Sequence, residues 1–480
     1  MTARCVMVLG TSSGAGKSWV ATALCAWYRA QGYKVAPFKA QNMSNNARVV
    51  ATPDGQWGEI GTAQYLQALA AGAVPDVRMN PLLLKPEADT HSQVVLFGQV
   101  DEALSRMPWR GRSLTVWPQI AQALDELRAE NDVVVIEGAG SPAEINLHAS
   151  DVVNMRVARH CDAHCLLVAD IDRGGAFAHL YGTWALLPPE ERALIKGFVL
   201  NKFRGDASLL APAPQMLQEL TGVPTVATIP MQFHHGLPEE DGVFDERSTA
   251  TGAVHTTIAV VAYPRISNLD EFQPLKAVPG VRLVWARSPA ELQAADWIIL
   301  PGSKATASDL QWLRRQGLDA AICAHAARGG RVLGICGGLQ MLGEALIDPH
   351  GIDGNAAGLG LLPLATLFDQ AKTVQPSRVQ LPALQSPWQA LSGVQAEGYE
   401  IHHGVTQLRA DMQAAGDRAT ELLPGLAWQG ANPAVLGTYM HGWFECPAVL
   451  HALFGAQAPT LDTVFARMAE GVSEWFGDAL

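Results

Sequence analysis

The sequence predicts an α/β protein of two domains, each with a mainly parallel sheet flanked by helices. Three observations predict this class: short apolar runs recur along the chain, helix-length segments separate them, and one polar connector divides the series. Uninterrupted apolar runs are typical of strands that are buried on both faces of a parallel sheet. The length of 480 residues suits two or three ordinary domains.

The apolar runs fall into two series. The first predicts strands at residues 5–9, 35–38, 133–136, 165–169, 197–200 and 225–229. The second predicts strands at residues 257–262, 282–285, 297–300, 331–335 and 435–439. The stretch between the two series is rich in Ser, Thr, Gly and Ala, as connectors are. We therefore expect a first domain over residues 1–245, a linker at 246–256 and a second domain over 257–480, although residues 365–430 give only a weak pattern.

Composition excludes several classes of function. The formal net charge of −12 argues against a nucleic acid partner, because phosphates repel an acidic surface. The sequence contains no apolar run long enough to span a membrane, and it has no cleavage site after residues 5–9. Seven scattered cysteines suit a reducing compartment better than a disulfide framework. We expect a cytoplasmic protein with small-molecule substrates, and the sequence leaves its oligomeric state open.

A glycine-rich loop follows the first predicted strand and precedes a helix-forming run. Glycines let backbone N–H groups converge on phosphate oxygens, a lysine adds positive charge, and a serine hydroxyl at the helix start can bind Mg²⁺. The candidate ATP ligands here are Gly10, Thr11, Gly14, Gly16, Lys17 and Ser18. Five residues separate Gly10 from Gly16, one more than in the usual phosphate loop, and this spacing resembles the dethiobiotin synthetase branch. The alternative is a glycine-rich turn without a nucleotide.

Three polar residues at the ends of other predicted strands suit the same site. Glu137 follows the strand at 133–136 and is the candidate Mg²⁺ ligand beside Ser18, because ligands bind at the carboxyl ends of such strands. Lys39 follows the strand at 35–38 and suits the charge of a transferred phosphoryl group. Asn201 follows the strand at 197–200 and is a candidate nucleotide contact. The alternatives are a solvated glutamate, a surface lysine and a turn-forming asparagine.

A second chemical site is predicted around Cys336. Residues 331–335 predict a strand, and Cys336-Gly337-Gly338 predicts a tight turn into a helix, with the thiol at the turn. Glycine after a nucleophile permits such an elbow, and a helix N-terminus stabilises a thiolate. Upstream, Gly302 lies in a turn after the strand at 297–300. Its backbone N–H and that of Gly337 are candidates for stabilising an oxyanion.

His441 follows the predicted strand at 435–439 and is the candidate general base for Cys336. These pieces, over residues 255–445, resemble the class I glutamine amidotransferase domain, which implies a flavodoxin-like fold and ammonia release from L-glutamine through a thioester. That family usually has a carboxylate two residues after the histidine, where this sequence has Trp443. We expect a Cys–His dyad or an orienting group from elsewhere; Glu445 is one nearby candidate. The alternative for His441 alone is a satisfied core histidine.

An ATP site and an ammonia-producing site on one chain imply amidation of a carboxylate through an acyl phosphate. Over nearly its full length the sequence resembles the cobyric acid synthase family. The segments that carry the resemblance are FKAQNMSNN at 38–46, GEIG at 58–61, EGAGSPAEINL at 137–147, DIDRGG at 170–175, LPEED at 237–241, PRISN at 264–268 and GYEIH at 398–402. The resemblance implies amidation of carboxylates b, d, e and g of adenosylcobyrinic acid a,c-diamide, a corrinoid.

The resembling segments also supply candidates for binding the corrinoid and a metal. Amide side chains offer both donors and acceptors, which suits a reader of corrinoid amides and carboxylates, although a solvated loop is the alternative. The substrate candidates are Gln41, Asn42, Ser44, Asn45, Asn46, Glu144 and Asn146, and Glu59 is a further metal candidate. Two other functions stay open: cobyrinic acid a,c-diamide synthase, which shares both domains, and a P-loop regulatory protein with an inactive amidotransferase domain.

Overall fold

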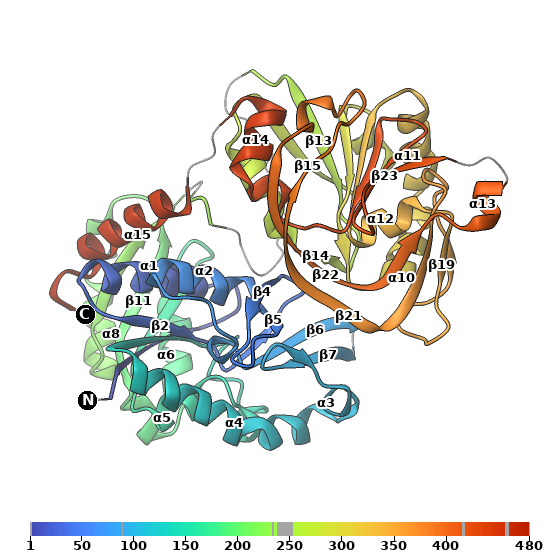
Figure 1. Ribbon diagram of the computed structural model, residues 1–480. Coiled ribbons are helices and arrows are strands. Elements are labelled where there is room, and N and C mark those ends of the chain that lie inside the picture. The colour runs from blue at the N-terminus through green and yellow to red at the C-terminus, as the bar shows by residue number, and fades with distance from the viewer. Residues whose placement is uncertain are drawn as a thin grey trace.

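The computed structural model describes residues 2–88, 90–232, 235–237, 253–414, 418–456 and 460–479, and it contains two α/β halves that meet along a broad interface (Figure 1). Residues 246–252 of the predicted linker lie outside the described residues, as do residues 238–241 of the LPEED segment. No helix among the described ranges is long and apolar enough to cross a membrane.

The first half is built on the six strands that the sequence predicts, all parallel. In spatial order they are β12 (Thr225–Pro230), β11 (Ile195–Phe203), β10 (His164–Asp170), β1 (Arg4–Gly10), β9 (Val133–Glu137) and β2 (Val35–Phe38). Successive residues of a strand face opposite sides: Val6 and Val8 join one buried cluster, whereas Met7 and Leu9 join another. Burial on both faces explains why the run at 5–9 has no polar alternation.

Helices cover both faces of this sheet. The face of Val6 and Val8 packs mainly against α1 (Lys17–Ala30), α2 (Thr62–Ala71) and α15 (Leu461–Phe476). The opposite face packs against α4 (Trp109–Glu130), α5 (Met155–His160), α6 (Ala176–Leu186) and α8 (Ala213–Thr221). Two short helices, α3 (Glu102–Arg106) and α7 (Pro189–Arg192), complete this half.

Six short strands between β2 and α3 form an extension that the sequence analysis does not predict. They are β3 (Gln41–Met43), β6 (Leu82–Ala88), β7 (His91–Leu96) and β8 (Gln99–Val100) in one small sheet, and β4 (Ala47–Ala51) and β5 (Trp57–Gly61) in an antiparallel pair. Because this extension leaves the carboxyl edge of β2, it carries residues 41–61 from the phosphate loop toward the second half (Figure 1).

The second half has a seven-stranded sheet whose first five strands are parallel and match the predicted series. In spatial order the strands are β15 (Val281–Ala286), β13 (Thr256–Val261), β16 (Trp297–Leu300), β18 (Arg331–Ile335), β25 (Val435–Thr438), β24 (Ala427–Gly430) and β23 (Ala419–Leu423). The last two are antiparallel and were not predicted. The α-helices are α9 (Pro289–Leu292), α10 (Thr306–Arg315), α11 (Leu318–Ala327), α12 (Gly337–Leu342), α13 (Ala410–Ala414) and α14 (Pro447–Phe454).

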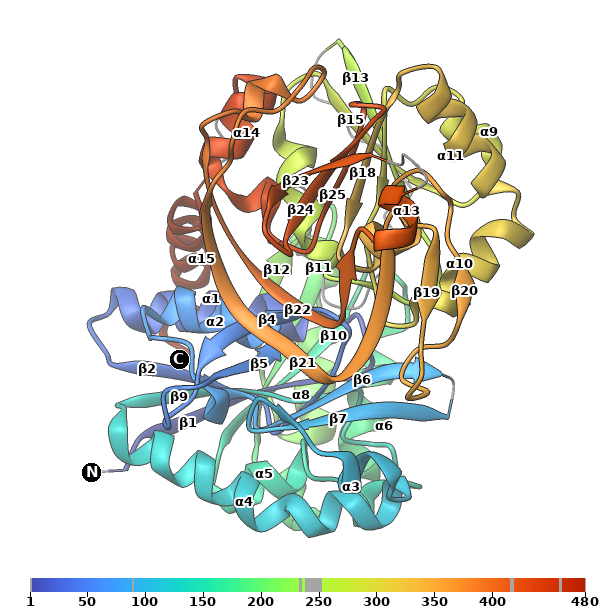
Figure 2. The same ribbon diagram turned by 45° about the vertical axis from the view of Figure 1, so that its right-hand side comes forward.

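The weakly patterned region 365–430 contains a long antiparallel ribbon of β21 (Ala365–Gln380) and β22 (Gln395–Gln407), beside β19 (Ala345–Ile347) and β20 (Ala356–Ala357). Figure 2 shows the ribbon curving from the second half down onto the extension of the first, where it contacts β4 and β5. Tyr399 and Ile401 of the ribbon form a buried cluster with Ala47, Leu83 and Val95. The two halves therefore share an apolar core at this junction.

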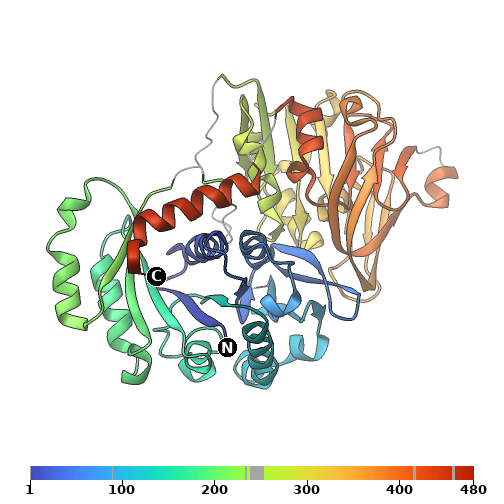
Figure 3. The ribbon, with the colours of Figure 1, turned by 60° about the vertical axis from the view of Figure 1, so that its left-hand side comes forward.

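The C-terminal helix α15 returns to the first half. Figure 3 shows it lying along the first half beside α1, and the contacts agree: the Trp27 indole donates to Ser473 Oγ at 2.8 Å, and the Trp19 and Trp475 rings lie 5.5 Å apart. The range expected for the second domain, 257–480, thus ends in a helix that packs on the first half.

Buried ion pairs also join the halves. Glu59 of β5 accepts from Lys85 of β6 at 2.6 Å and from Lys372 of β21, and all three side chains are less than 10% exposed. Burial raises the pKa of Glu59, but the two ammonium groups outweigh it and hold that pKa below its ordinary value. Burial lowers the pKa of Lys372 to about 7, against the attraction of Glu59 and with repulsion from other lysines. Glu59 is therefore the carboxylate that these two buried lysines share.

Glu59→Gln should destabilise the protein by about 3–5 kcal/mol, because it leaves two buried ammonium groups without their carboxylate. Thermal and denaturant unfolding measure this loss. The difference from wild type should be largest between pH 4.5, the ordinary pKa of glutamate, and about pH 7, where Lys372 loses its proton, and it should shrink as acid protonates Glu59. Glu87→Gln, which breaks the more exposed pair with Lys304, is the matched control and should cost about 1 kcal/mol or less. Equal effects of the two substitutions contradict this account.

Candidate active sites

Cys336 stands at the turn between β18 and α12, as the sequence analysis predicts. Its backbone φ of 53° lies in the left-handed region, and its side chain is buried. The turn requires glycine at position 338, because a Cβ there would lie 1.9 Å from the carbonyl oxygen of Leu300. The segment is therefore a tight elbow that presents a thiol at the start of a helix, the arrangement that nucleophilic cysteines use.

His441, just after β25, is held by a carboxylate that the sequence analysis did not identify. Its Nδ1 lies 3.0 Å from Oε1 of Glu271, and the other carboxylate oxygen accepts from the N–H of Gly442 at 2.9 Å. Burial lowers the pKa of His441, but Glu271 and the neighbouring Cys336 outweigh burial and raise that pKa to about 10. A carboxylate on Nδ1 orients the ring so that Nε2 remains for the thiol.

The carboxylate comes from η4 (Leu269–Ala277), 170 positions before the histidine. No spacing rule links positions so far apart, so only the DE pair after the PRISN segment hinted at a carboxylate here. The candidate named from the sequence, Glu445, instead contacts Arg48 of the first half. Trp443 is buried, and it occupies the position where class I glutamine amidotransferases usually have a carboxylate.

The turn after β16 lies against both Cys336 and His441. Gly302 and Ser303 form β17, which pairs with β14 (Ile266–Ser267). A Cβ at Gly302 would lie 2.8 Å from His441 Cε1, and a Cβ at Gly337 would lie 2.8 Å from the backbone nitrogen of Ser303. The structure thus brings the four residues predicted for glutamine hydrolysis into one place.

A small cavity of about 50 Å³ opens beside Cys336 and is lined by both halves. Asn45 and Lys85 come from the extension of the first half, and Lys304, Gln340 and Lys372 come from the second. Asn45 was a candidate corrinoid contact, and the structure places it in this cavity instead of the phosphate-loop cavity. The second half alone therefore does not complete the wall around the thiol.

A much larger cavity, about 840 Å³, lies at the carboxyl edge of the first sheet. It is lined by most of the residues that the sequence analysis assigned to ATP, metal and corrinoid. These are Gly14, Gly16, Lys17, Ser18, Lys39, Gln41, Asn42, Asn46, Glu137, Glu144 and Asn201. Cavities of this size are typical of small-molecule sites.

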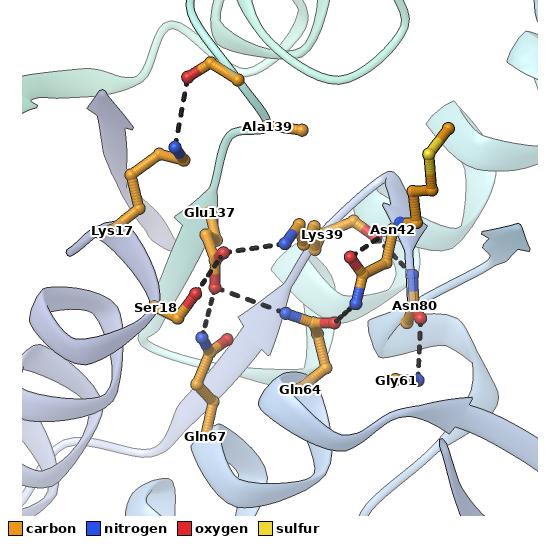
Figure 4. Close-up of polar contacts among 12 residues, drawn as sticks. Lys17, Ser18, Lys39, Asn42, Gly61, Gln64, Gln67, Asn80, Glu137 and Ala139 are labelled. Atoms are coloured by element: carbon orange, nitrogen blue, oxygen red, sulfur yellow. Dashed lines mark hydrogen bonds and ion pairs between the residues drawn. The ribbon is translucent and has the colours of Figure 1, made fainter. Parts of the chain in front are cut away.

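Glu137 is the centre of a buried polar network in this cavity (Figure 4). One carboxylate oxygen accepts from Ser18 Oγ and from Lys39 Nζ, each at 2.8 Å, and the other accepts from Gln67 at 2.5 Å. Burial raises the pKa of Glu137, but Lys39 and these donors outweigh it and lower that pKa. Gln64 links the network to Asn42, whose amide donates to Gln64 Oε1 at 3.0 Å. Glu137 therefore presents charged oxygens beside the phosphate loop.

The phosphate loop has the backbone that its glycines predict. Gly16 has φ 96° and directly precedes α1, and a Cβ there would lie 2.1 Å from the side-chain nitrogen of Asn201, so this position requires glycine. Lys17 Nζ donates to carbonyl oxygens of residues 12 and 140 at 3.0 and 3.1 Å. Asn201 donates to the carbonyl oxygen of Ala15 at 2.9 Å. The loop is thus tied by Lys17 to the segment after β9 and by Asn201 to the end of β11.

Two nucleotide candidates and several other candidates lie away from the lining of the large cavity. Gly10 ends β1 and packs on the Lys17 side chain, and the Thr11 N–H donates to Val168 O at 2.9 Å. Ser44 is buried and accepts from the Asn46 N–H at 3.1 Å, whereas Asn146 is exposed. The metal candidate Glu59 lies in the lysine pairs described above, so the structure does not bring it together with Ser18 and Glu137.

Sequence reasoning missed other polar residues of the large cavity. Asp170 ends β10 and pairs with Lys202 at 3.3 Å, and Lys202 also donates to the carbonyl oxygen of Gly14 at 2.9 Å. The DIDRGG segment holds Asp170 and Arg173, both of which line the cavity. The signal was available, because Asp170 follows a predicted strand just as Glu137 does.

Comparisons with known proteins assign each half of the chain to a domain family. Residues 6–240 match the CobQ/CobB/MinD/ParA nucleotide binding domain, and residues 257–449 match the CobB/CobQ-like glutamine amidotransferase domain. The chain is thus a glutamine amidotransferase joined to a nucleotide-binding domain.

Full-length relatives narrow this class. The chain is 75% identical to the cobyric acid synthase of Paracidovorax citrulli (strain AAC00-1), covering 100% of this chain and 98% of the relative. It is 77% identical to the cobyric acid synthase of Acidovorax sp. (strain JS42), covering 99% and 96%. The chain belongs to the cobyric acid synthase family.

Glu271→Gln should lower kcat for glutamine hydrolysis by about two to four orders of magnitude, because a neutral amide does not stabilise the protonated His441 ring as the carboxylate does. The KM for glutamine should change much less. Steady-state ammonia release measures both constants, with Glu445→Gln as the control for the acid named from the sequence. A larger loss in Glu445→Gln than in Glu271→Gln contradicts the assignment of Glu271.

Proposed function

We propose that this chain amidates carboxylates b, d, e and g of adenosylcobyrinic acid a,c-diamide, using ATP to activate each carboxylate and ammonia from glutamine to form each amide. As a member of the cobyric acid synthase family, it is a glutamine-dependent carbon–nitrogen ligase. The observation that carries the proposal is the pairing of two cavities, one around Cys336 and one around the phosphate loop, that both border residues 41–46.

Glutamine hydrolysis follows from the geometry at Cys336. Cys336 gives its proton to His441 Nε2, as the raised pKa of His441 favours, and Sγ then attacks the side-chain amide carbon of glutamine while Glu271 stabilises the charged ring. Backbone N–H groups of the Gly302–Ser303 turn and of Gly337 stabilise the oxyanion. The C–N bond breaks as His441 returns the proton to the leaving nitrogen, which departs as ammonia. Water then hydrolyses the thioester, giving glutamate and the free thiol.

Carboxylate activation follows from the charges at the phosphate loop. Backbone N–H groups of residues 11–18 and the Lys17 ammonium cradle the phosphates of ATP. A corrinoid carboxylate oxygen attacks the γ-phosphorus, and ADP leaves with the electrons of the broken P–O bond. Lys39 neutralises charge on the transferred group. Ammonia then attacks the acyl carbon, forming the C–N bond and releasing phosphate.

Ser18 and Glu137 fit Mg²⁺, because a hydroxyl and a carboxylate 2.8 Å apart are hard oxygen donors of the kind this cation prefers. The bound cation would neutralise charge on the β- and γ-phosphates. Lys39 pairs with the same Glu137 oxygen at 2.8 Å and therefore lies beside these two candidate ligands. Glu59 is left out of this ligand set because two lysines already hold it.

Corrinoid binding is assigned to the amide-rich wall of the large cavity. Gln41, Asn42 and Asn46 offer both donors and acceptors, which suits a substrate that gains amides in place of carboxylates. Glu144 also lines the cavity and is exposed. The division into a synthetase domain at 1–245, a linker at 246–256 and an amidotransferase domain at 257–480 remains our proposal. So does a cytoplasmic location, which rests on seven unpaired cysteines.

Counting the amides added to the substrate tests the proposal against its nearest alternative. Incubation with ATP, glutamine and adenosylcobyrinic acid a,c-diamide should give a product in which four carboxylic acids have become amides, which mass spectrometry detects as a small decrease in mass at each conversion. Cobyrinic acid, offered in its place, should not be converted to its a,c-diamide. Amidation of cobyrinic acid at a and c instead supports the alternative diamide synthase and contradicts the proposal.

Cys336→Ser should abolish glutamine-dependent amidation and spare amidation with added ammonium, since the phosphate-loop site does not contain the thiol. Lys17→Ala should stop both activities, because it removes the charge that binds the phosphates. The amide product is measured with each nitrogen source in turn. Glutamine-dependent product from Cys336→Ser refutes the nucleophile, and full ammonium-dependent activity in Lys17→Ala refutes the ATP site.

Glu137→Gln should raise the Mg²⁺ concentration for half-maximal amidation by about 10- to 100-fold, as loss of a ligand does. A Mg²⁺ titration of ammonium-dependent amidation measures this. Gln67→Met is the matched control, because it removes a hydrogen bond to Glu137 but leaves both carboxylate oxygens of Glu137 in place. It should shift the Mg²⁺ titration much less. An unchanged Mg²⁺ requirement in an active Glu137→Gln variant contradicts the ligand assignment.

A further inference from the structure

Residues 46–48 of the first half touch three segments that hold His441. The first segment is η4, which carries Glu271. The second is β22, whose Tyr399 forms an isolated bridge with His441. The third is η6 (Trp443–Glu445), which follows His441 by two positions. The segments next to His441 are thus contacted by residues from the other half of the molecule.

The N-terminus of η4 is capped across the interface. The Leu269 N–H donates to Asn46 Oδ1 at 3.2 Å, and the Ala47 N–H donates to Asn268 Oδ1 at 3.0 Å. Asn268 has φ 53°, in the left-handed region, and both asparagines are buried, so each amide has a partner that water does not replace. The start of the helix that carries Glu271 is therefore fixed by residues 46–47.

Arg48 adds a buried charge to the same contact. Its guanidinium pairs with the carboxylates of Asp270 and Glu445 and donates to Tyr399 Oη at 2.8 Å. The side chains of Arg48 and Asp270 are 5% and 1% exposed, whereas that of Glu445 is 32% exposed. Asp270 directly precedes Glu271, so without this cation three carboxylates would face one another in a space with little water.

Arg48 also bears on the other side of the imidazole. The guanidinium carbon lies 5.0 Å from the centre of the Tyr399 ring, and that ring stacks on His441 with centroids 5.4 Å apart and planes 20° apart. Tyr399 and His441 also exchange backbone hydrogen bonds of 3.2 and 2.8 Å. One side chain therefore contacts both the segment that binds Nδ1 and the ring that covers the imidazole face.

We propose that Arg48 is a positioning residue for glutamine hydrolysis. Through Asp270 and Tyr399 it fixes Glu271 and His441 in the geometry that proton transfer from Cys336 requires. The proposal rests on the proposed roles of Cys336, His441 and Glu271, and it adds that the nucleotide-binding half completes the glutaminase site.

The contact also reaches the synthetase cavity. Asn46 binds the start of η4, and Asp270 of η4 pairs with Arg48. Both Asn46 and Asp270 also line the 840 Å³ cavity of the phosphate loop. A substrate carboxylate or amide that binds there meets the same wall that orients Glu271. The two chemical sites therefore share one structural element.

Arg48→Met tests the proposal in the full-length enzyme. We expect kcat for glutamine hydrolysis to fall by about 10- to 100-fold, since small displacements of catalytic groups have effects of that size. The KM for glutamine should change less than threefold, or about 0.65 kcal/mol at most, because Arg48 does not line the thiol cavity. Amidation with added ammonium should stay within about twofold of wild type, which also shows that the variant folds.

Three further variants separate positioning from general damage. Arg48→Lys keeps the charge and should recover part of kcat. Arg48→Met with Asp270→Asn removes cation and buried carboxylate together and should recover more than Arg48→Met alone. Arg78→Met, which removes another arginine paired with acids of the first half, should leave kcat unchanged.

Equal losses of glutamine- and ammonium-dependent amidation, or an unchanged kcat in Arg48→Met, overturn the proposal. Failure of the underlying function is distinguishable, because it would appear as glutamine hydrolysis that persists in Cys336→Ser. Inactive Cys336→Ser together with fully active Arg48→Met removes only the role of Arg48.

Discussion

The guanidinium of Arg48 places a positive charge where Asp270, Glu445 and Tyr399 enclose it and little water reaches. A buried cation needs its carboxylates, and they need it, so the segments that bear them keep a fixed distance. One of those segments carries Glu271, which holds His441, and the strand that bears Arg48 continues from the amide-rich wall of the large cavity. Much of the second site's geometry depends on this constraint.

Buried ion pairs contribute little net stability, because desolvation offsets their attraction. Their repeated use at this junction, in the Arg48 pairs and in the Glu59–Lys85–Lys372 group, suggests a different contribution. An apolar interface such as the cluster around Tyr399 and Ile401 tolerates small shifts, whereas paired charges fix one register. A fixed register suits an enzyme in which one half makes ammonia and the other half consumes it.

The parts that sequence reasoning predicted are those whose neighbours lie close in the chain. Strand, loop and helix at residues 4–30 and the elbow at Cys336 are local patterns with few alternatives. Glu271, by contrast, meets His441 across 170 positions, and Arg48 meets Asp270 across 222. The ribbon of β21 and β22 was not predicted. Buried and exposed residues do not alternate regularly along either strand, so the sequence there lacks the period of two that indicates a strand.

A double-mutant cycle on Arg48→Met and Glu271→Gln tests the central claim most directly, with kcat/KM for glutamine hydrolysis as the measurement. If Arg48 acts through Glu271, the double variant should be no slower than Glu271→Gln alone, and the coupling should reach about 1 kcal/mol or more. If the losses of kcat/KM in the two single variants multiply in the double variant, Arg48 and Glu271 act independently, and the interface does not position Cys336, His441 and Glu271.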